Sequence, residues 1–316
     1  MIHLHYLFLE FNITTDSTII FIKALSMIIF YMYFCLLLNR DYDIGYKYMT
    51  KIMHLNLGWF TINMILGLMG FGYKTYGEIG SKGFFYAGNE TSLLLLVMFY
   101  YYLTSSTAKY KNILSIAFLI FSYLLGTKTG MISCLVLFIV YYYLSLKKRF
   151  RPVFFLLLFI GGYVVYRYLI VMYSSLPVIL NAVKKFNWRY GQSGDILNAL
   201  LSNRILYLSN YYDFWKTHFS MQNLFFGIGK PVFLTGIEID FFVYFFQTGL
   251  LFTSVILGFY LFLIMRSRKH TLLFTLNLLF LGISFSAGHV WGGVMAGYFF
   301  VCINALHVFE NKKCIG

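Results

Sequence analysis

The sequence predicts an all-α, polytopic integral membrane protein, and its composition carries most of that prediction. Of the 316 residues, 60% are hydrophobic and only 11% are charged, whereas an ordinary soluble domain has roughly 25% charged residues. Apolar runs that approach the roughly 20 residues needed to cross a bilayer as a helix recur along the chain. Proline occurs only 3 times, so few of these helices are interrupted.

Apolar runs separated by polar residues predict about nine membrane-spanning helices. Their approximate bounds are 17–38, 52–73, 91–105, 112–126, 130–146, 152–173, 238–265, 271–287 and 290–308. The runs show no internal repeat and no low-complexity segment. We therefore expect a single membrane domain over residues 1–316.

The basic residues between these spans predict the orientation of the chain. If consecutive spans alternate in direction, the following clusters face one side: Arg40, Lys47 and Lys51; Lys109 and Lys111; Lys147, Lys148, Arg149 and Arg151; Arg266, Arg268 and Lys269; Lys312 and Lys313. By the positive-inside rule, this side is the cytoplasm. One missed or invented helix would have placed strongly basic loops on opposite sides, so their agreement supports the count.

Charge and cysteine content exclude several other classes of protein. The net charge of +14 arises from short clusters between apolar runs rather than from one basic face, so we expect no nucleic-acid partner. The four cysteines, Cys35, Cys134, Cys302 and Cys314, lie in or beside apolar segments without the spacing of metal ligands. They predict buried apolar side chains rather than a zinc site or a disulfide framework.

The connection over residues 174–237 is the longest in the predicted topology, and it lies on the extracytoplasmic side. Its charged residues are Lys184, Lys185, Arg189, Arg204, Lys216 and Lys230 against Asp195 and Asp213. A basic outer loop runs against the positive-inside trend. Loops of this length are usually functional or have structure of their own, so this loop is the feature that a function must explain.

Polar and ionisable residues also gather at the helix ends that face the same outer side. They are Asn89 and Glu90 before the third span, Lys128 before the fifth, Glu238 and Asp240 before the seventh, and His289 between the last two. An ionisable residue at membrane depth costs about 2.5–3.5 kcal/mol on insertion scales. Their clustering therefore predicts a shared, water-filled cavity.

Each of these residues has a structural alternative. The carboxylates could cap helix N-termini, and Lys128 could extend its amine to the interface. His289 could be a loop histidine without a role. Glu238 and Asp240 are two residues apart, so on a helix they point in different directions and only one of them would face the cavity.

The order of short motifs resembles the bacterial Wzy-type polysaccharide polymerases, relatives of the O-antigen ligases. The motifs, from about residue 50 onward, are Gly88-Asn89-Glu90, Thr127-Lys128-Thr129-Gly130, Ser202-Asn203-Arg204, Phe226-Gly227-Ile228-Gly229, Glu238-Ile239-Asp240, Gln247-Thr248-Gly249 and Gly288-His289. Similar proteins often carry another acid shortly after the Glu-x-Asp pair, where this chain has Val243.

The resemblance implies a glycosyltransferase that joins oligosaccharide repeat units carried on undecaprenyl pyrophosphate, as in capsule or O-antigen biosynthesis. It implies a multi-pass protein of the bacterial cytoplasmic membrane with its active face outside. The expected partners are the lipid-linked oligosaccharide, membrane lipids, a chain-length regulator and a flippase. The alternatives are a glycan ligase, which uses the same donor chemistry, and a flippase for lipid-linked oligosaccharides.

Such a reaction predicts two kinds of residue. One group must remove the proton of the acceptor hydroxyl, and Glu238, Asp240 and His289 are the candidates for this role. Cations must stabilise the departing pyrophosphate, and we assign Arg204 to it with Arg189 or Lys128 assisting, because guanidinium binds phosphate oxygens in pairs. Asn89 and Glu90 complete the predicted substrate-binding set. The scheme requires no metal and no cofactor.

Overall fold

The structure is a computed structural model that describes residues 15–75, 80–85, 88–105, 110–171, 177–217, 219–228, 239–288 and 290–313. Within these ranges the chain is 86% helical, with 13 helices. The predicted all-α class is therefore confirmed. Two predicted site residues, Glu238 and His289, lie outside the described residues.

Each predicted span overlaps one of the long helices in the described part of the chain. These helices are α2 (Thr15–Arg40), α3 (Tyr42–Leu68), α4 (Gly88–Thr104), α5 (Lys111–Leu125), α6 (Lys128–Ser145), α7 (Arg151–Val171), α12 (Asp240–Ser267), α13 (Thr271–Ser286) and α14 (Val294–Lys313). By length and composition, α6, α12 and the Phe21–Arg40 part of α2 are able to cross a membrane. Membrane association is therefore indicated, and the count of nine spans stays a prediction.

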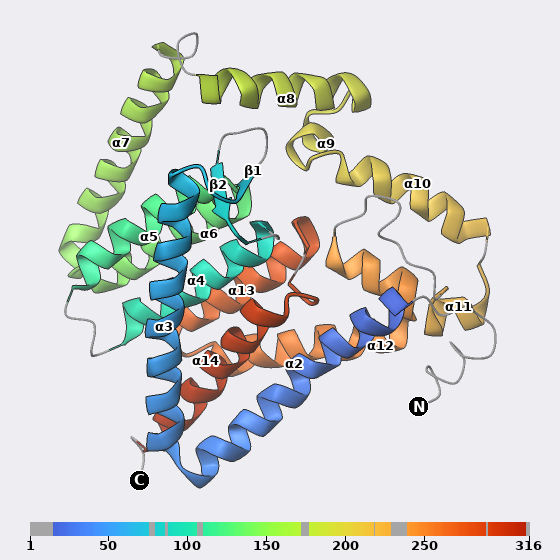
Figure 1. The fold of residues 1–316 in the computed structure, drawn as a ribbon, viewed down its shortest axis with the longest axis horizontal. Helices are drawn as coiled ribbons and strands as arrows, with labels where there is room; N and C mark the ends of the chain where they lie inside the picture. The colour runs from blue at the N-terminus through green and yellow to red at the C-terminus, as the bar shows by residue number, and fades with distance from the viewer. Residues whose placement is uncertain are drawn as a thin grey trace.

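The segment predicted as a long outer loop is itself largely helical. It contains α8 (Pro177–Ser193), α9 (Ile196–Leu200), α10 (Arg204–Thr217) and α11 (Met221–Phe226). Figure 1 shows α8 lying across the top of the view and α10 continuing down its right side. The predicted loop is thus a set of four helices that follow the top and the right side of the bundle in this view.

A small β-hairpin after α3 was not predicted from the sequence. Its strands are β1 (Tyr73–Thr75) and β2 (Gly80–Gly83), and they pair antiparallel. Asn63 on α3 fixes the hairpin to the bundle, because its side-chain amide donates to the Lys82 carbonyl at 2.7 Å. The oxygen of the same side chain accepts from the backbone N–H of Phe84 at 2.7 Å.

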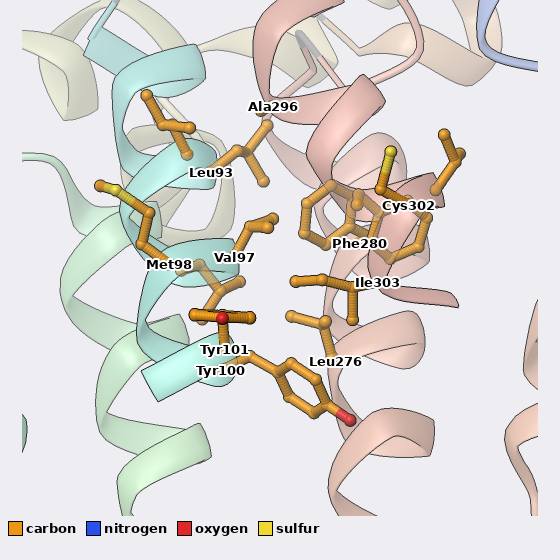
Figure 2. Close-up of a cluster of buried hydrophobic side chains, with 14 of the residues drawn as sticks. Leu93, Val97, Met98, Tyr100, Tyr101, Leu276, Phe280, Ala296, Cys302 and Ile303 are labelled. Atoms are coloured by element: carbon orange, nitrogen blue, oxygen red, sulfur yellow. The ribbon is translucent and has the colours of Figure 1, made fainter. Parts of the chain in front are cut away.

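Helix α4 is the centre of the bundle. Every residue from Leu93 to Leu103 is buried, as expected of a helix that is apolar on all sides and surrounded by other helices. It packs against α5, α6, α13 and α14. Figure 2 shows its side of the core facing that of α13 and α14, with Leu93, Val97, Tyr100 and Tyr101 opposite Leu276, Phe280, Ala296 and Ile303, while Met98 points to the other side of α4.

The N-terminus of α4 meets the C-terminus of α13 and the N-terminus of α14. The Asn89 side chain donates to the carbonyl of Ala287 at 3.4 Å. Glu90 Oε1 accepts from the backbone N–H of Met295, in the first turn of α14, at 3.1 Å. These contacts place three helix ends at one end of the bundle, which is the end predicted to face away from the cytoplasm.

The C-terminus of α4 lies at the opposite end of the bundle. A cavity of about 420 Å³ there is lined by residues that include Tyr46, Thr104 and His270. Lys47 and Lys269 directly adjoin two of them in sequence. Two of the basic clusters predicted to face the cytoplasm therefore lie together at this end.

Helix α12 is broken in its first half. Gly249 has φ 75° and ψ 178°, which is not a helical conformation. A Cβ at Gly249 would lie 2.3 Å from the Phe225 carbonyl oxygen, and a Cβ at Gly227 would lie 2.4 Å from the Gln247 carbonyl carbon. Glycine at both positions therefore lets the end of α11 pack backbone to backbone against α12.

A second, smaller core joins the helices of the predicted outer loop to α12. We call these helices, α8 to α11, the outer helices. It consists of Tyr211 and Trp215 from α10, Ile228 after α11, and Val243 and Phe246 from α12. Val243 is 2% exposed. A carboxylate in its place would be buried among aromatic rings at a high free-energy cost.

Candidate functional site

A cavity of about 230 Å³ lies at the end of the bundle where α4 and α6 begin. Its lining residues are Asn89, Gly126, Thr127, Lys128, Thr129, Lys185, Phe186, Arg189, Ser202 and Arg204. We call it the basic cavity, because Lys128, Lys185, Arg189 and Arg204 all line it. No Asp or Glu is among the described residues that do so.

The basic cavity brings together residues that are far apart in sequence. Four of the five residues predicted to bind substrate, Asn89, Lys128, Arg189 and Arg204, line it. They come from α4, α6, α8 and α10. Glu90, the fifth, is not among the described lining residues.

Lys128 is placed by the tight turn between α5 and α6. Gly126 ends α5 in the left-handed conformation, with φ 66°, and the Thr127 hydroxyl then caps α6 by accepting from the Gly130 N–H at 3.2 Å. The same hydroxyl is hydrogen-bonded to that of Ser92 on α4. Lys128 Nζ donates to the carbonyl of Leu200 at 3.0 Å, which links α6 to the outer helices.

Arg204 is placed by a strained turn between α9 and α10. Ser202 and Asn203 have φ 62° and 61°, a left-handed conformation that residues other than glycine rarely adopt. Asn203 is 2% exposed, and its side chain donates to Gln192 Oε1 at 2.8 Å. This turn sets Arg204 as the first residue of α10, where its Nη1 donates to the Ser286 carbonyl at 2.8 Å.

The remaining two cations come from α8. Lys185 and Arg189 are four residues apart on the same helix face, and both are half-buried at the cavity wall. Lys185 was not predicted as a site residue, although its spacing from Arg189 was a signal for it. A helix with two cations on one face supplies half of the charge of the cavity.

The charge of the basic cavity favours an anionic ligand. Arg189 and Arg204 are close enough to Lys128 for their positive charges to repel its ammonium group, because like charges at short range repel one another. A phosphate or pyrophosphate group would relieve that repulsion and accept several charged hydrogen bonds. The volume of about 230 Å³ suits a small charged group rather than a whole lipid.

Asp240 and Glu90 hold helix ends instead of lining the basic cavity. Asp240, which is 7% exposed, accepts from the backbone N–H groups of Val290 at 2.6 Å and Trp291 at 3.0 Å. Glu90 accepts from the N–H of Met295. Both carboxylates thus organise the chain that leads into α14, and the proton-accepting role predicted for Asp240 stays a prediction.

The cavity at the opposite end of the bundle has different chemistry. His270 and His307 lie with ring centroids 3.8 Å apart, and Glu310 lies 3.9 Å from the ring of His307. No Lys or Arg is among its described lining residues. Of the two cavities, the basic cavity is the one suited to an anion.

Comparison with protein-family models, with curated proteins and with solved structures gave no match for this chain.

Proposed function

We propose that this chain is a polysaccharide polymerase that joins undecaprenyl-pyrophosphate-linked oligosaccharide repeat units at the outer face of a bacterial cytoplasmic membrane. The single observation that supports it most is the basic cavity. Its four cations come from α6, α8 and α10 and surround a space without an acidic lining residue in the described part of the chain. Such a space is suited to the pyrophosphate of a lipid-linked donor.

The proposed reaction transfers the donor glycan to an acceptor hydroxyl. The bond between the donor sugar carbon and the pyrophosphate oxygen breaks, and a bond from the acceptor oxygen to that carbon forms. The hydroxyl proton passes to a base, and polyprenyl pyrophosphate leaves with the bonding electrons. Arg204 and Arg189 would stabilise the negative charge on the leaving group, and Lys128 and Lys185 would add to the positive electrostatic potential of the cavity.

Glu238 and His289 are the proposed bases. Both lie outside the described residues. Asp240 follows Glu238 by two residues and Val290 directly follows His289, and the backbone N–H of Val290 donates to Asp240 at 2.6 Å. The carboxylate of Asp240 already accepts two backbone N–H groups. Asp240 is therefore better suited to hold this region in place than to accept a proton.

The test replaces Arg204 with Ala and with Lys in the native host after deletion of its own gene copy. Loss of one donor to a leaving-group charge lowers turnover by roughly 100-fold, so Arg204→Ala should accumulate lipid-linked single repeat units. Arg204→Lys keeps the positive charge but not the planar guanidinium, so its turnover should lie between that of Arg204→Ala and that of the wild type. Lys216→Ala is the matched control, because this exposed cation lies on the same helix but not in the cavity.

The readout is the length distribution of polymer and of lipid-linked saccharides at equal protein levels. Normal polymer length in Arg204→Ala would remove this residue from the mechanism. Accumulation of intermediates on the cytoplasmic side would favour a flippase instead. Polymer of normal length that is not transferred to its final acceptor would favour a ligase.

A further inference from the structure

An apolar groove adjoins the basic cavity. It has a volume of about 490 Å³ and runs between α6 and α13 under the turn that joins α9 to α10. Its apolar wall includes Ile132 and Val136 from α6 and Leu278, Leu279 and Ile283 from α13. We call it the α6–α13 groove.

The groove and the basic cavity adjoin each other. Lys128, Thr129, Ser202 and Arg204 line both of them. Lys128 and Arg204 therefore stand at the boundary, with cations on one side and aliphatic side chains on the other. A ligand that occupies both of them must have a negatively charged end and an apolar end.

The groove opens sideways onto the apolar outer surface of the bundle. Ile132 is 62% exposed and Leu278 is 44% exposed. A Cβ placed on Gly282, which also lines the groove, would meet no atom within 4 Å. In a membrane this surface faces lipid, so a chain lying in the groove would continue directly into the bilayer.

The groove lies between two helices that are in contact. Aliphatic side chains from both of them line it, so it suits an apolar hydrocarbon chain. Its volume falls within the range of roughly 300–1,000 Å³ that is usual for ligand pockets.

We propose that the α6–α13 groove binds the phosphate-proximal part of a single isoprenoid chain while the basic cavity holds the attached pyrophosphate. The inference rests on the proposed function and specifies its donor as a one-chain lipid. Charge complementarity fixes the head at Lys128 and Arg204, and the groove then directs the chain between Ile132 and Leu278 toward the membrane.

The test uses photo-crosslinking, which does not depend on polymer formation. The purified full chain in vesicles of neutral phospholipid is irradiated with a polyprenyl phosphate that carries a diazirine in its first isoprene unit. We expect crosslinks to peptides of α6 and α13. Unlabelled polyprenyl pyrophosphate should compete, whereas inorganic pyrophosphate should compete far less and the two-chain lipid phosphatidylglycerol should not compete.

Gly282→Trp fills the groove and should lower crosslinking by about tenfold, the factor that corresponds to about 1.4 kcal/mol of binding free energy. Gly258→Trp is the matched control, because Gly258 lies on α12 with equally open space around its Cβ position and does not line the groove. Ile132→Trp is a second filling variant from the opposite wall. Size-exclusion profiles in detergent check that all three variants fold.

The outcomes separate this inference from the proposed function. Equal crosslinking in Gly282→Trp, Ile132→Trp and Gly258→Trp would overturn the groove as the chain site. Competition by phosphatidylglycerol as strong as that by polyprenyl pyrophosphate would overturn the one-chain specificity. Crosslinking that depends on the groove, together with normal polymer in Arg204→Ala, would support the lipid site and contradict the proposed role of Arg204.

Discussion

Two consecutive residues in the left-handed conformation decide where Arg204 lies. Ser202 and Asn203 are not glycines, so their backbone conformation costs roughly 1–2 kcal/mol each, although asparagine tolerates it better. Strain of this kind is concentrated at functional sites. The hydrogen bond from Asn203 to Gln192 and the burial of Asn203 offset part of this cost.

Ser202→Gly should raise the free energy of unfolding by about 0.5–1 kcal/mol, because glycine adopts positive φ without steric strain. Ser209→Gly is the control, since Ser209 lies inside α10 and glycine there should lower stability by a similar amount. Thermal unfolding in detergent measures both. Destabilisation by Ser202→Gly would mean that its hydroxyl matters more than its backbone.

At the scale of the element, a buried amide pair joins three helices near the end of the bundle opposite the basic cavity. The side chains of Asn277 on α13 and Asn304 on α14 donate to each other at 2.9 and 3.0 Å. Asn277 also donates to the Leu263 carbonyl and the Ser267 hydroxyl of α12. Polar groups that are buried among helices are stable only when they are paired in this way.

Asn277→Leu should lower the free energy of unfolding by about 1–2 kcal/mol, because it leaves the buried amide of Asn304 without its side-chain partner. The double variant Asn277→Leu/Asn304→Leu should lose less unfolding free energy than the sum of the losses of the two single variants. Asn56→Leu on α3 is the control, since its amide bonds only within its own helix at an exposed position. Additive losses would show that the pair is not coupled.

At the scale of the whole molecule, the two cavities mark opposite ends of the bundle. The basic cavity lies where α4 begins, and the cavity lined by His270 lies where α4 ends. The positive-inside rule assigns the His270 end to the cytoplasm. The basic cavity would then open to the outside, where the proposed acceptor glycan is found.

A membrane-impermeant maleimide should therefore label Thr129→Cys, but not His270→Cys, in intact cells. Both variants are made with Cys35, Cys134, Cys302 and Cys314 replaced by Ala. Thr129 lines the basic cavity and His270 lines the opposite one. After the cells are opened, His270→Cys should react as well. Labelling of His270→Cys alone in intact cells would reverse the orientation.

The positions of the long helices were predictable because apolar runs of nearly membrane-spanning length need no tertiary information. Of the helix-end residues predicted to share a cavity, Asn89 and Lys128 do line the basic cavity, together with the loop residues Arg189 and Arg204, whereas Glu90 and Asp240 are not among its described lining residues. The β1–β2 hairpin was missed because it depends on Asn63, which bonds to Phe84, 21 positions away.

The capping contacts of the acids were harder to predict. Asp240 contacts Trp291, 51 positions away, and Glu90 contacts Met295, 205 positions away. Such partners are set by packing, so the sequence alone left helix capping open beside the substrate-binding role predicted for Glu90 and the catalytic role predicted for Asp240. The break at Gly249 was missed for the same reason, because it depends on the backbone of α11.

Three of the four cations of the basic cavity belong to α8 and α10, and only Lys128 belongs to a helix of the central bundle. The bundle supplies a frame, and the outer helices supply most of the charge. Recognition of the ligand can therefore diverge through substitutions in residues 177–217, while the packing around α4 is left intact. A protein built in this way can acquire a new ligand without having to evolve a new scaffold.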